Sequence, residues 1–242
     1  MLEKSLNNND EIEVLTARWQ EVNRRVAEAA DGREIRILAA TKTVSAERIN
    51  YAIDQLGLSL IGENRVQELL EKYDDLHKDG VEIHFIGRLQ TNKVKYIVDK
   101  VDMIESVDSL RLAEEISRRA EKIGRVMDIL VEVNLGREES KGGIFPEELD
   151  AFLEAILPLP GIRFAGIMVI PPKIAENEDS EKYFSESFQI FLDIQTKKHH
   201  NIREPLLLSM GMSDSYEAAI RCGSGQVRLG SAIFGHRNIN ES

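Results

Sequence analysis

Eight short apolar runs recur along this chain, and each is separated from the next by a segment with helical periodicity. The runs are rich in Ile, Val and Leu, which is typical of parallel strands covered by helices. They lie at Ile35–Lys42, Leu58–Glu63, Glu82–Gly87, Met103–Ser106, Met127–Asn134, Arg163–Ile170, Leu206–Met210 and Val227–Gly230. Eight strands that alternate with helices favour a single closed (β/α)8 barrel of the TIM type over an open doubly wound sheet.

The helical patterns between these runs complete the predicted barrel. They lie at Ala46–Leu56, Arg65–His77, Asn92–Lys100, Ser109–Ile123, Pro146–Leu157, Tyr183–His199 and Asp214–Gly223, and a further helix, Asp10–Ala30, precedes the first strand. The chain has 242 residues, close to the roughly 250 that one barrel needs. No linker divides it, so we expect one domain over residues 1–242, with residues 1–9 frayed.

Composition narrows the classes of function. The formal net charge of −11 disfavours non-specific binding to nucleic acid or to anionic membranes, and no apolar run approaches the length of a membrane span. The one cysteine, Cys222, excludes an intramolecular disulfide and fits a reducing compartment, so a cytoplasmic location is expected. The five histidines form no metal-binding pattern, and the chain has neither a GxSxG nor a P-loop sequence.

Two Gly/Ser-rich turns near the end of the chain predict a phosphate site. They follow the seventh and eighth strands, where phosphate sites of barrel enzymes commonly lie. The first turn opens a helix whose N-cap is predicted to be Ser213 or Asp214, with Glu217 close to a capping-box position. Free N–H groups at such a helix start favour an anion. The expected phosphate cradle consists of Ser209, Gly211, Ser213, Gly230 and Ser231.

A lysine at the end of the first strand suggests what the phosphate belongs to. Lys42 follows the small apolar run Ile37–Ala40, so we expect it at the mouth of the barrel rather than on an ordinary surface position. Desolvation there would favour the neutral amine that attacks an aldehyde. A lysine beside a phosphate site indicates a Schiff base with a phosphorylated aldehyde, and pyridoxal 5'-phosphate is the cofactor of that description.

Other candidates each have a plainer interpretation. Arg228, inside an apolar strand, either pairs with a carboxylate or faces a cofactor ring, where it would keep a pyridine nitrogen unprotonated and weaken the ring as an electron sink. Asn64 either caps a helix or approaches the cofactor. His84 and Met168 are expected to fill the core.

The residues around these candidates resemble the pyridoxal phosphate homeostasis protein family. The resembling blocks are Thr41–Thr43, Gly62–Glu68, His84–Lys93, Ser209–Asp214 and Val227–Gly235, so the resemblance covers nearly the whole chain. It implies a fold-type III barrel like the N-terminal domain of alanine racemase. It also implies a Schiff base at Lys42, Arg228 near the pyridine nitrogen, Asn64 near the cofactor, and phosphate contacts from Ser209, Ser213, Gly230 and Ser231.

Two details of the resemblance concern single positions. Many relatives carry threonine where this chain has Ser231, and serine keeps the hydroxyl donor. The segment Lys141–Gly143 looks like the Lys-x-Gly loop of the family, which we interpret as a lid or release element.

Three functions fit these residues. The first is a non-catalytic pyridoxal phosphate binder that sets the supply of the cofactor, with PLP-dependent apoenzymes as partners and a monomeric state. The second is an amino-acid racemase, which needs a second acid–base group; all five tyrosines lie in predicted helices: Tyr51, Tyr73, Tyr96, Tyr183 and Tyr216. The third is a sugar-phosphate aldolase using Lys42, with Glu63 and His84 as its candidate acid–base partners. The binder is favoured.

Overall fold

The computed structural model describes residues 2–137, 142–171, 180–197 and 201–235. Its eight strands form one closed barrel in sequential order, every neighbouring pair is parallel, and the first strand pairs with the last. The strands are β1 Arg36–Ala40, β2 Leu60–Glu63, β3 Glu82–Phe85, β4 Met103–Val107, β5 Met127–Val133, β6 Ile162–Val169, β7 Ile202–Met212 and β8 Gln226–Leu229. The predicted (β/α)8 architecture is confirmed.

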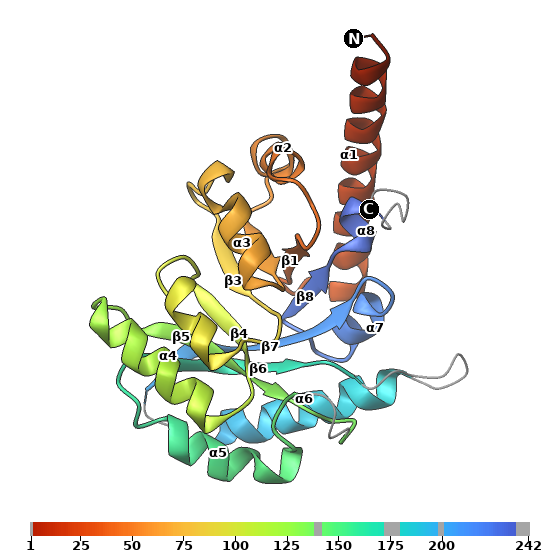
Figure 1. Cartoon of the computed structure of the whole chain (residues 1–242). Helices are drawn as coiled ribbons and strands as arrows, with labels where there is room; N and C mark the ends of the chain where they lie inside the picture. Colours follow the sequence, from red (N-terminus) through yellow and green to blue (C-terminus); the bar gives the residue numbers. More distant parts are fainter. Residues whose placement is uncertain (1, 138–141, 172–179, 198–200, 236–242) are drawn as a thin grey trace.

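Helices surround the barrel (Figure 1). The α-helices are α1 Leu2–Ala30, α2 Ala46–Leu56, α3 Val66–Lys72, α4 Leu110–Lys122, α5 Leu149–Ile156, α6 Ser180–Thr196, α7 Tyr216–Arg221 and α8 Ser231–Phe234, and three 3-10 turns are η1 Tyr73–Asp75, η2 Thr91–Tyr96 and η3 Pro146–Glu148. Among these described residues, no helix has the combination of length and apolar character needed to cross a bilayer.

The helices differ from the prediction in three places. The first helix, α1, begins at Leu2 rather than at Asp10, and the segment before Asp10 has no Gly or Pro that would end it. The third βα connection is the short 3-10 turn η2 rather than a helix over Asn92–Lys100. The helix α8, with four residues, was not predicted because it is too short to show a period.

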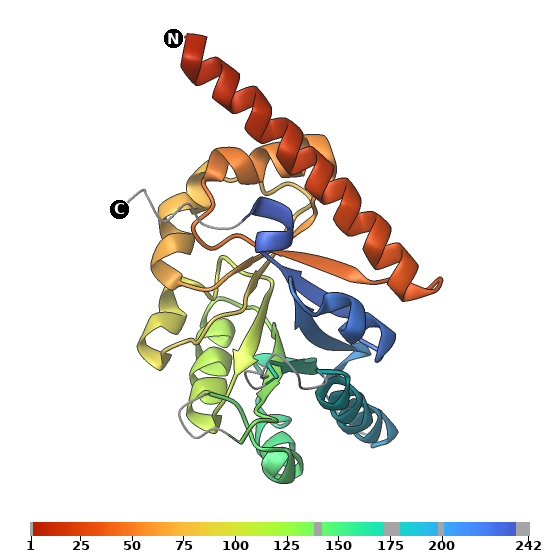
Figure 2. The ribbon, with the colours of Figure 1, turned by 90° about the vertical axis from the view of Figure 1, so that its right-hand side faces the viewer.

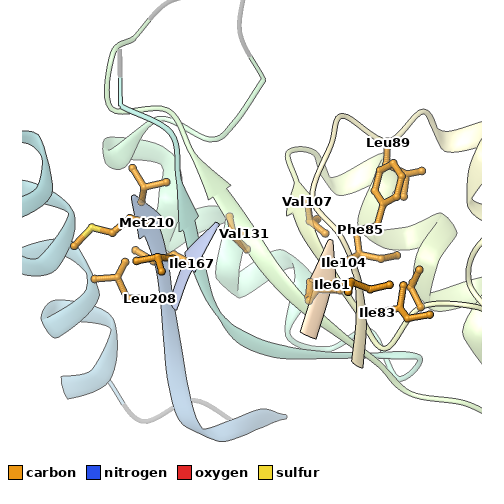
Figure 3. Packing of buried hydrophobic residues seen from close by; sticks show 14 of the residues in the cluster. Ile61, Ile83, Phe85, Leu89, Ile104, Val107, Val131, Ile167, Leu208 and Met210 are labelled. Atoms are coloured by element: carbon orange, nitrogen blue, oxygen red, sulfur yellow. The ribbon is translucent and has the colours of Figure 1, made fainter. Parts of the chain in front are cut away.

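Side-chain alternation along the strands builds two separate layers of core. Residues such as Ile61, Ile83 and Phe85 point outwards and pack under the helices in the main hydrophobic cluster (Figure 3). The residues between them point into the barrel. There, two small apolar clusters are found: Leu38, Ala40, Leu60 and Ile86 form one, and Met103, Leu130, Ala165 and Met168 form the other. Met168 therefore fills the barrel interior, as expected.

One glycine permits a close approach between β6 and β7. Gly166 has a φ of 137°, and a Cβ at this position would lie 1.9 Å from the carbonyl oxygen of Leu207. The β6–β7 ladder changes register beside it, between Phe164 and Gly166. Only glycine fits here, so the shape of the barrel wall at this point depends on it.

The helix α1 covers the seam at which the barrel closes. It packs against α7 and α8, which flank β8, and Figure 2 shows α8 lying beside α1 near one end of the barrel. Four residues on one face of α1 are buried: Leu15, Val22, Val26 and Ala30. The indole Nε1 of Trp19 also donates to the carbonyl oxygen of Leu56 at 2.8 Å, which ties α1 to α2. The first and last strands are thus held together from outside.

Candidate functional site

The turn after β1 and the turn after β8 meet at the mouth of the barrel. In the ladder between these strands, Leu38 is opposite Arg228 and Ala39 is opposite Leu229. A Cβ added at Gly230 would lie 3.4 Å from the carbonyl oxygen of Ala40. The turn that begins at Gly230 therefore lies directly beside the turn that carries Lys42.

Lys42 occupies an exposed position in this turn. Leu38 and Ala40 point into the barrel, and one further step of the same alternation predicts an inner position for Lys42, two residues beyond the end of β1. Its expected desolvation is not found in the protein alone, because the residue lies beyond the end of β1 and is exposed. A buried environment for this amine would have to come from whatever binds at the mouth.

Ser213 joins the two predicted Gly/Ser turns to each other. Its Oγ accepts the backbone N–H of Gly230 at 3.2 Å and that of Ala232 at 3.1 Å. A hydroxyl that accepts two bonds still has its own proton to donate. Ser213 and the half-buried Ser231, the first residue of α8, therefore place hydroxyl groups at the start of a helix, where an anion is favoured.

The predicted cap of the helix after β7 was wrong. The helix α7 begins at Tyr216 and its N-cap is Ser215, not Ser213 or Asp214. The hydroxyl of Ser213 is unavailable for that cap because it serves the turn after β8. Glu217 forms an ion pair with Arg25 of α1 instead of closing a capping box.

Two residues of the expected cradle lie inside the protein. Gly211 is buried, with a φ of 95°, and a Cβ there would lie 2.6 Å from the Cβ of Ala219, so this glycine lets α7 pack against β7. Ser209 is also fully buried, and its Oγ donates to Glu105 Oε2 at 2.7 Å inside the barrel. In the protein alone, the Ser209 hydroxyl is thus engaged by side chains below the mouth, and its expected contact with the phosphate stays a prediction.

Arg228 is a buried cation held by oxygen atoms on two neighbouring strands. Its NH1 donates to the carbonyl oxygen of Ser209 at 2.8 Å and to the Oγ of Ser209 at 2.9 Å, and its NH2 donates to the carbonyl oxygen of Val169 at 2.9 Å. Burial lowers the pKa of Arg228, opposed by the charges of Glu105 and Glu132. The guanidinium has five N–H groups, so protons remain for a group above it.

Below Arg228, a chain of polar side chains runs through the barrel. Gln226 Nε2 donates to Glu105 Oε1 at 2.7 Å, and His84 Nδ1 lies 2.6 Å from the same oxygen. His84 Nε2 lies 3.4 Å from Glu82 Oε2, which also accepts from Arg36 at 2.7 Å. The chain ends at Glu82, whose side chain is 47% exposed at the opposite end of the barrel from the mouth.

The charged groups in this row of polar side chains shift the pKa values of one another. Burial disfavours a charged imidazole, but hydrogen bonds to the carboxylates of Glu105 and Glu82 outweigh it and raise the pKa of His84. Burial would raise the pKa of Glu105, but the hydrogen bond and charge of His84, the charge of Arg228 and the Ser209 hydroxyl lower it overall. The hydrogen bond from His84 and the Arg36 ion pair lower the pKa of Glu82 to about 2. The two carboxylates beside His84 therefore favour its charged form.

Asn64 brings an unsatisfied atom to the site. It follows β2, and its Oδ1 is buried without a hydrogen-bond partner. The cap alternative is excluded, because the N-cap of α3 is Arg65. A buried polar atom without a partner carries a free-energy cost, and a ligand that bonds to it would remove that cost.

The sequence analysis did not single out three charged side chains that are buried or nearly buried in the structure: Glu105, Glu132 and Lys72. Glu105 and Glu132 interrupt apolar strands in the same way as Arg228 does, so the sequence contained the pattern that marks them. Burial, and after it the charge of Asp108, raise the pKa of Glu132, while Arg228 and Arg88 oppose this. Lys72 was missed because, on a charged helix, nothing distinguishes it from other surface lysines.

Of the predicted loop Lys141–Gly143, the structure describes Gly142 and Gly143, and Lys141 lies outside the described residues. Gly143 packs against Asn134, since a Cβ there would lie 3.0 Å from the Cβ of Asn134. Within the described parts of the chain, no group of three His, Cys, Asp or Glu residues is arranged to hold a metal ion.

These features define a class of protein. It is a parallel (β/α)8 barrel in which a lysine follows the first strand and a predicted anion cradle follows the last two strands, at the same end of the barrel. The sequence profile of the alanine racemase N-terminal domain matches residues 13–238. A protein from Aquifex aeolicus named pyridoxal phosphate homeostasis protein is 46% identical over 202 residues, which is 84% of this chain and 87% of the relative. Its namesake in Escherichia coli K12 is 36% identical over 86% of this chain and 88% of the relative. The chain belongs to the pyridoxal phosphate homeostasis protein family.

A solved structure agrees with this assignment. PipY from Synechococcus elongatus, determined with PLP bound, superposes with a TM-score of 0.76 at 30% identity, covering 88% of this chain and 99% of PipY. The two proteins therefore share the same barrel fold over nearly all of PipY and most of this chain.

Proposed function

We propose that this protein binds pyridoxal 5'-phosphate in the mouth of the barrel, as a Schiff base on Lys42, and takes part in intracellular vitamin B6 homeostasis without catalysis of its own. The observation that carries the proposal is the contact between the Lys42 turn and the Ser213–Ser231 cradle across the β1–β8 seam. This contact brings an amine and an anion site to the same edge of the barrel. The name of the relatives and the PLP-bound PipY support the same ligand.

The side chains at the mouth suit the parts of this cofactor. The hydroxyls of Ser213 and Ser231, with the start of α8, suit a phosphate. The unpaired Asn64 Oδ1 marks a polar position that lacks a partner in the protein alone. Gly230 leaves room for a ligand because no side chain projects from it beside Ala40.

Arg228 determines what the bound cofactor can do. A cofactor of this kind supplies an electron sink when its ring nitrogen carries a proton. Arg228 is a permanent donor with protons left over, so opposite that nitrogen it would donate a hydrogen bond and leave the nitrogen unprotonated. Such an environment would weaken the electron sink and narrow the chemistry to proton transfers at most.

A racemase is the alternative that we place second. Racemisation needs a second acid–base group on the opposite face from the lysine. The five tyrosines all lie in helical elements: Tyr51 in α2, Tyr73 in η1, Tyr96 in η2, Tyr183 in α6 and Tyr216 in α7. None of them lies at a strand end, so none supports a racemase site.

The aldolase has less support still, because its acid–base candidates are engaged elsewhere. Glu63 is fully buried between the barrel wall and α3, where it forms an ion pair with Lys72. His84 is enclosed between two carboxylates. Apoenzymes that depend on PLP as partners, a monomeric state and a cytoplasmic location belong to the same proposal.

The test is an absorbance spectrum of the purified protein before and after borohydride, followed by mass mapping of the modified peptide. We expect a visible absorbance band that borohydride removes, with the pyridoxyl group on Lys42. Lys42→Ala is expected to lose the adduct at that position, while Lys78→Ala, a half-buried lysine away from the mouth, keeps it. A colourless protein that stays unlabelled with added pyridoxal phosphate would overturn the proposal and favour the aldolase.

A further inference from the structure

A second lysine holds the turn that carries Lys42. Lys72 is the last residue of α3, and its side chain is only 11% exposed. Its Nζ donates to the carbonyl oxygen of Thr41 at 2.9 Å, to that of Val44 at 3.1 Å and to Glu63 Oε1 at 2.6 Å. An ammonium has three protons, and all three are used here. Two of them fix the two ends of the turn over residues 41–44.

The carboxylate of Glu63 connects this ammonium to the residue before Lys42. Glu63 is fully buried, and its Oε1 accepts from the hydroxyl of Thr41 at 2.5 Å as well as from Lys72. Thr41 points to the outer layer, where β2 meets α3, and the next residue, Lys42, is exposed. The contacts that hold the turn therefore lie outside the barrel.

The turn needs such a grip because its backbone is strained. Thr43 has a φ of 63°, in the left-handed region that β-branched residues rarely adopt. The N–H of Thr43 donates to Glu68 Oε2 at 2.8 Å, and the N–H of Val44 donates to the carbonyl oxygen of Thr41 at 3.0 Å. A conformation of this kind persists only where its surroundings over-determine it.

We propose that Lys72 is a positioning residue for Lys42, which keeps the strained turn in the one conformation that presents the Lys42 amine to a carbonyl at the mouth. The inference deepens the proposed cofactor binding and rests on it. A purely structural role would predict that Lys72 only attaches α3 to the barrel. The two roles differ, because positioning must change how fast Lys42 reacts in protein that is fully folded.

The test uses variants that leave no unpaired carboxylate buried. Lys72→Met is made together with Glu63→Gln, and Glu63→Gln alone is the reference. Lys78→Met is the matched control, because Lys78 also donates to two backbone carbonyls, those of Tyr73 and Leu76, but away from the turn. Two readouts are taken: hydrogen exchange of the 43 and 44 amides without ligand, and the rate at which added pyridoxal phosphate becomes fixed to Lys42 by borohydride.

In the Glu63→Gln/Lys72→Met protein, we expect faster exchange of the two amides and a rate of fixation lower by roughly ten- to a hundredfold than in Glu63→Gln. Lys72→Arg, tested alone, should keep a large part of the rate. Adding Thr43→Gly to the double variant should restore most of the loss, because glycine adopts this φ without a steric cost.

Unchanged exchange and unchanged rate in folded double variant would overturn the inference, and so would a slow rate that Thr43→Gly does not restore. If wild-type protein fixes no pyridoxal phosphate at Lys42, the proposed function fails. The exchange readout then still decides whether Lys72 holds the turn.

Discussion

Glu105 meets Arg228 through the hydroxyl of Ser209, which donates to the carboxylate at 2.7 Å and accepts from the guanidinium at 2.9 Å. All three side chains are almost completely buried. The carboxylate of Glu105, which balances the charge of Arg228, is therefore linked to it by a hydroxyl whose orientation is fixed by these two hydrogen bonds. This bridge fixes the height of the guanidinium in the barrel, just below the mouth.

Glu105→Gln should weaken the protein far more than a surface change of the same kind. The variant leaves two buried cations without their carboxylate. It also replaces one of the two accepting oxygens, that of Gln226 and His84 or that of Ser209, by an NH2 donor, so we expect a loss of roughly 3 kcal/mol in the free energy of unfolding. Glu115→Gln on α4, which breaks ion pairs with Arg118 and Arg119 near the surface, should cost less than about 1 kcal/mol. Urea unfolding measures both, and equal losses would contradict the bridge.

The raised pKa of His84 predicts a pH dependence. The pKa of His84 is raised above its ordinary 6.5 by Glu105 and Glu82 against burial and the charge of Arg36, so its contribution to stability is complete below that pH. The contribution is lost as the pH rises through the folded-state pKa. The difference in unfolding free energy between wild type and His84→Gln should therefore be largest below pH 6.5 and shrink as the pH rises above that value.

The exposed His77, which pairs with Asp54, provides the matched control through His77→Gln. At the acid end, the lowered pKa of Glu105 keeps the pair intact until the pH falls below the ordinary carboxyl value of 4.5. A His84 difference that grows with pH would show that the imidazole is neutral in the folded protein.

Ser213→Ala should reduce affinity for pyridoxal phosphate with little effect on the barrel. The variant removes one hydroxyl from the cradle and leaves the N–H groups of Gly230 and Ala232 without their acceptor. A hydrogen bond to a charged group contributes about 1.5–3 kcal/mol, so the Kd should rise by roughly ten- to a hundredfold. Ser45→Ala, which removes the N-cap hydroxyl of α2, is the control. An unchanged Kd in Ser213→Ala would place the phosphate elsewhere.

Gly166→Ala should destabilise the barrel wall. The added Cβ would lie 1.9 Å from the carbonyl oxygen of Leu207, and backbone cannot yield as a side chain can, so we expect a loss above about 3 kcal/mol. Gly124→Ala has a left-handed φ of 67° but nothing within 4 Å of the new Cβ, so its loss should stay near 1 kcal/mol. Thermal unfolding compares the two variants, and similar losses would mean that φ alone matters.

The barrel could be predicted because its signal is local. Strands such as Met127–Val133 are short, mostly apolar runs that remain recognisable without knowledge of their neighbours. The mouth could be predicted in outline for the same reason, since Lys42 and the Gly/Ser turns follow strand ends in sequence.

The interior could not be predicted, because its partners are far apart in the chain. Ser209 bonds to a residue 104 positions away, and Gln226 bonds to the same residue across 121 positions. A serine next to a glycine turn looks the same whether its hydroxyl faces a ligand or a buried carboxylate. The proposed role of Lys72 could not be predicted either. It depends on the strained φ of Thr43, and a threonine in a sequence gives no sign of a positive φ.

The seam between β1 and β8 has a consequence for how the protein matures. Lys42 follows the first strand to leave the ribosome, whereas Ser213, Arg228 and Ser231 lie in or just after the last two strands. The β1–β8 ladder, which brings these two ends of the chain together, forms only when the barrel closes. Under the proposed function, a ligand bound between these two turns would contact both sides of the closing ladder. Binding of the cofactor would then require, and stabilise, the closed barrel.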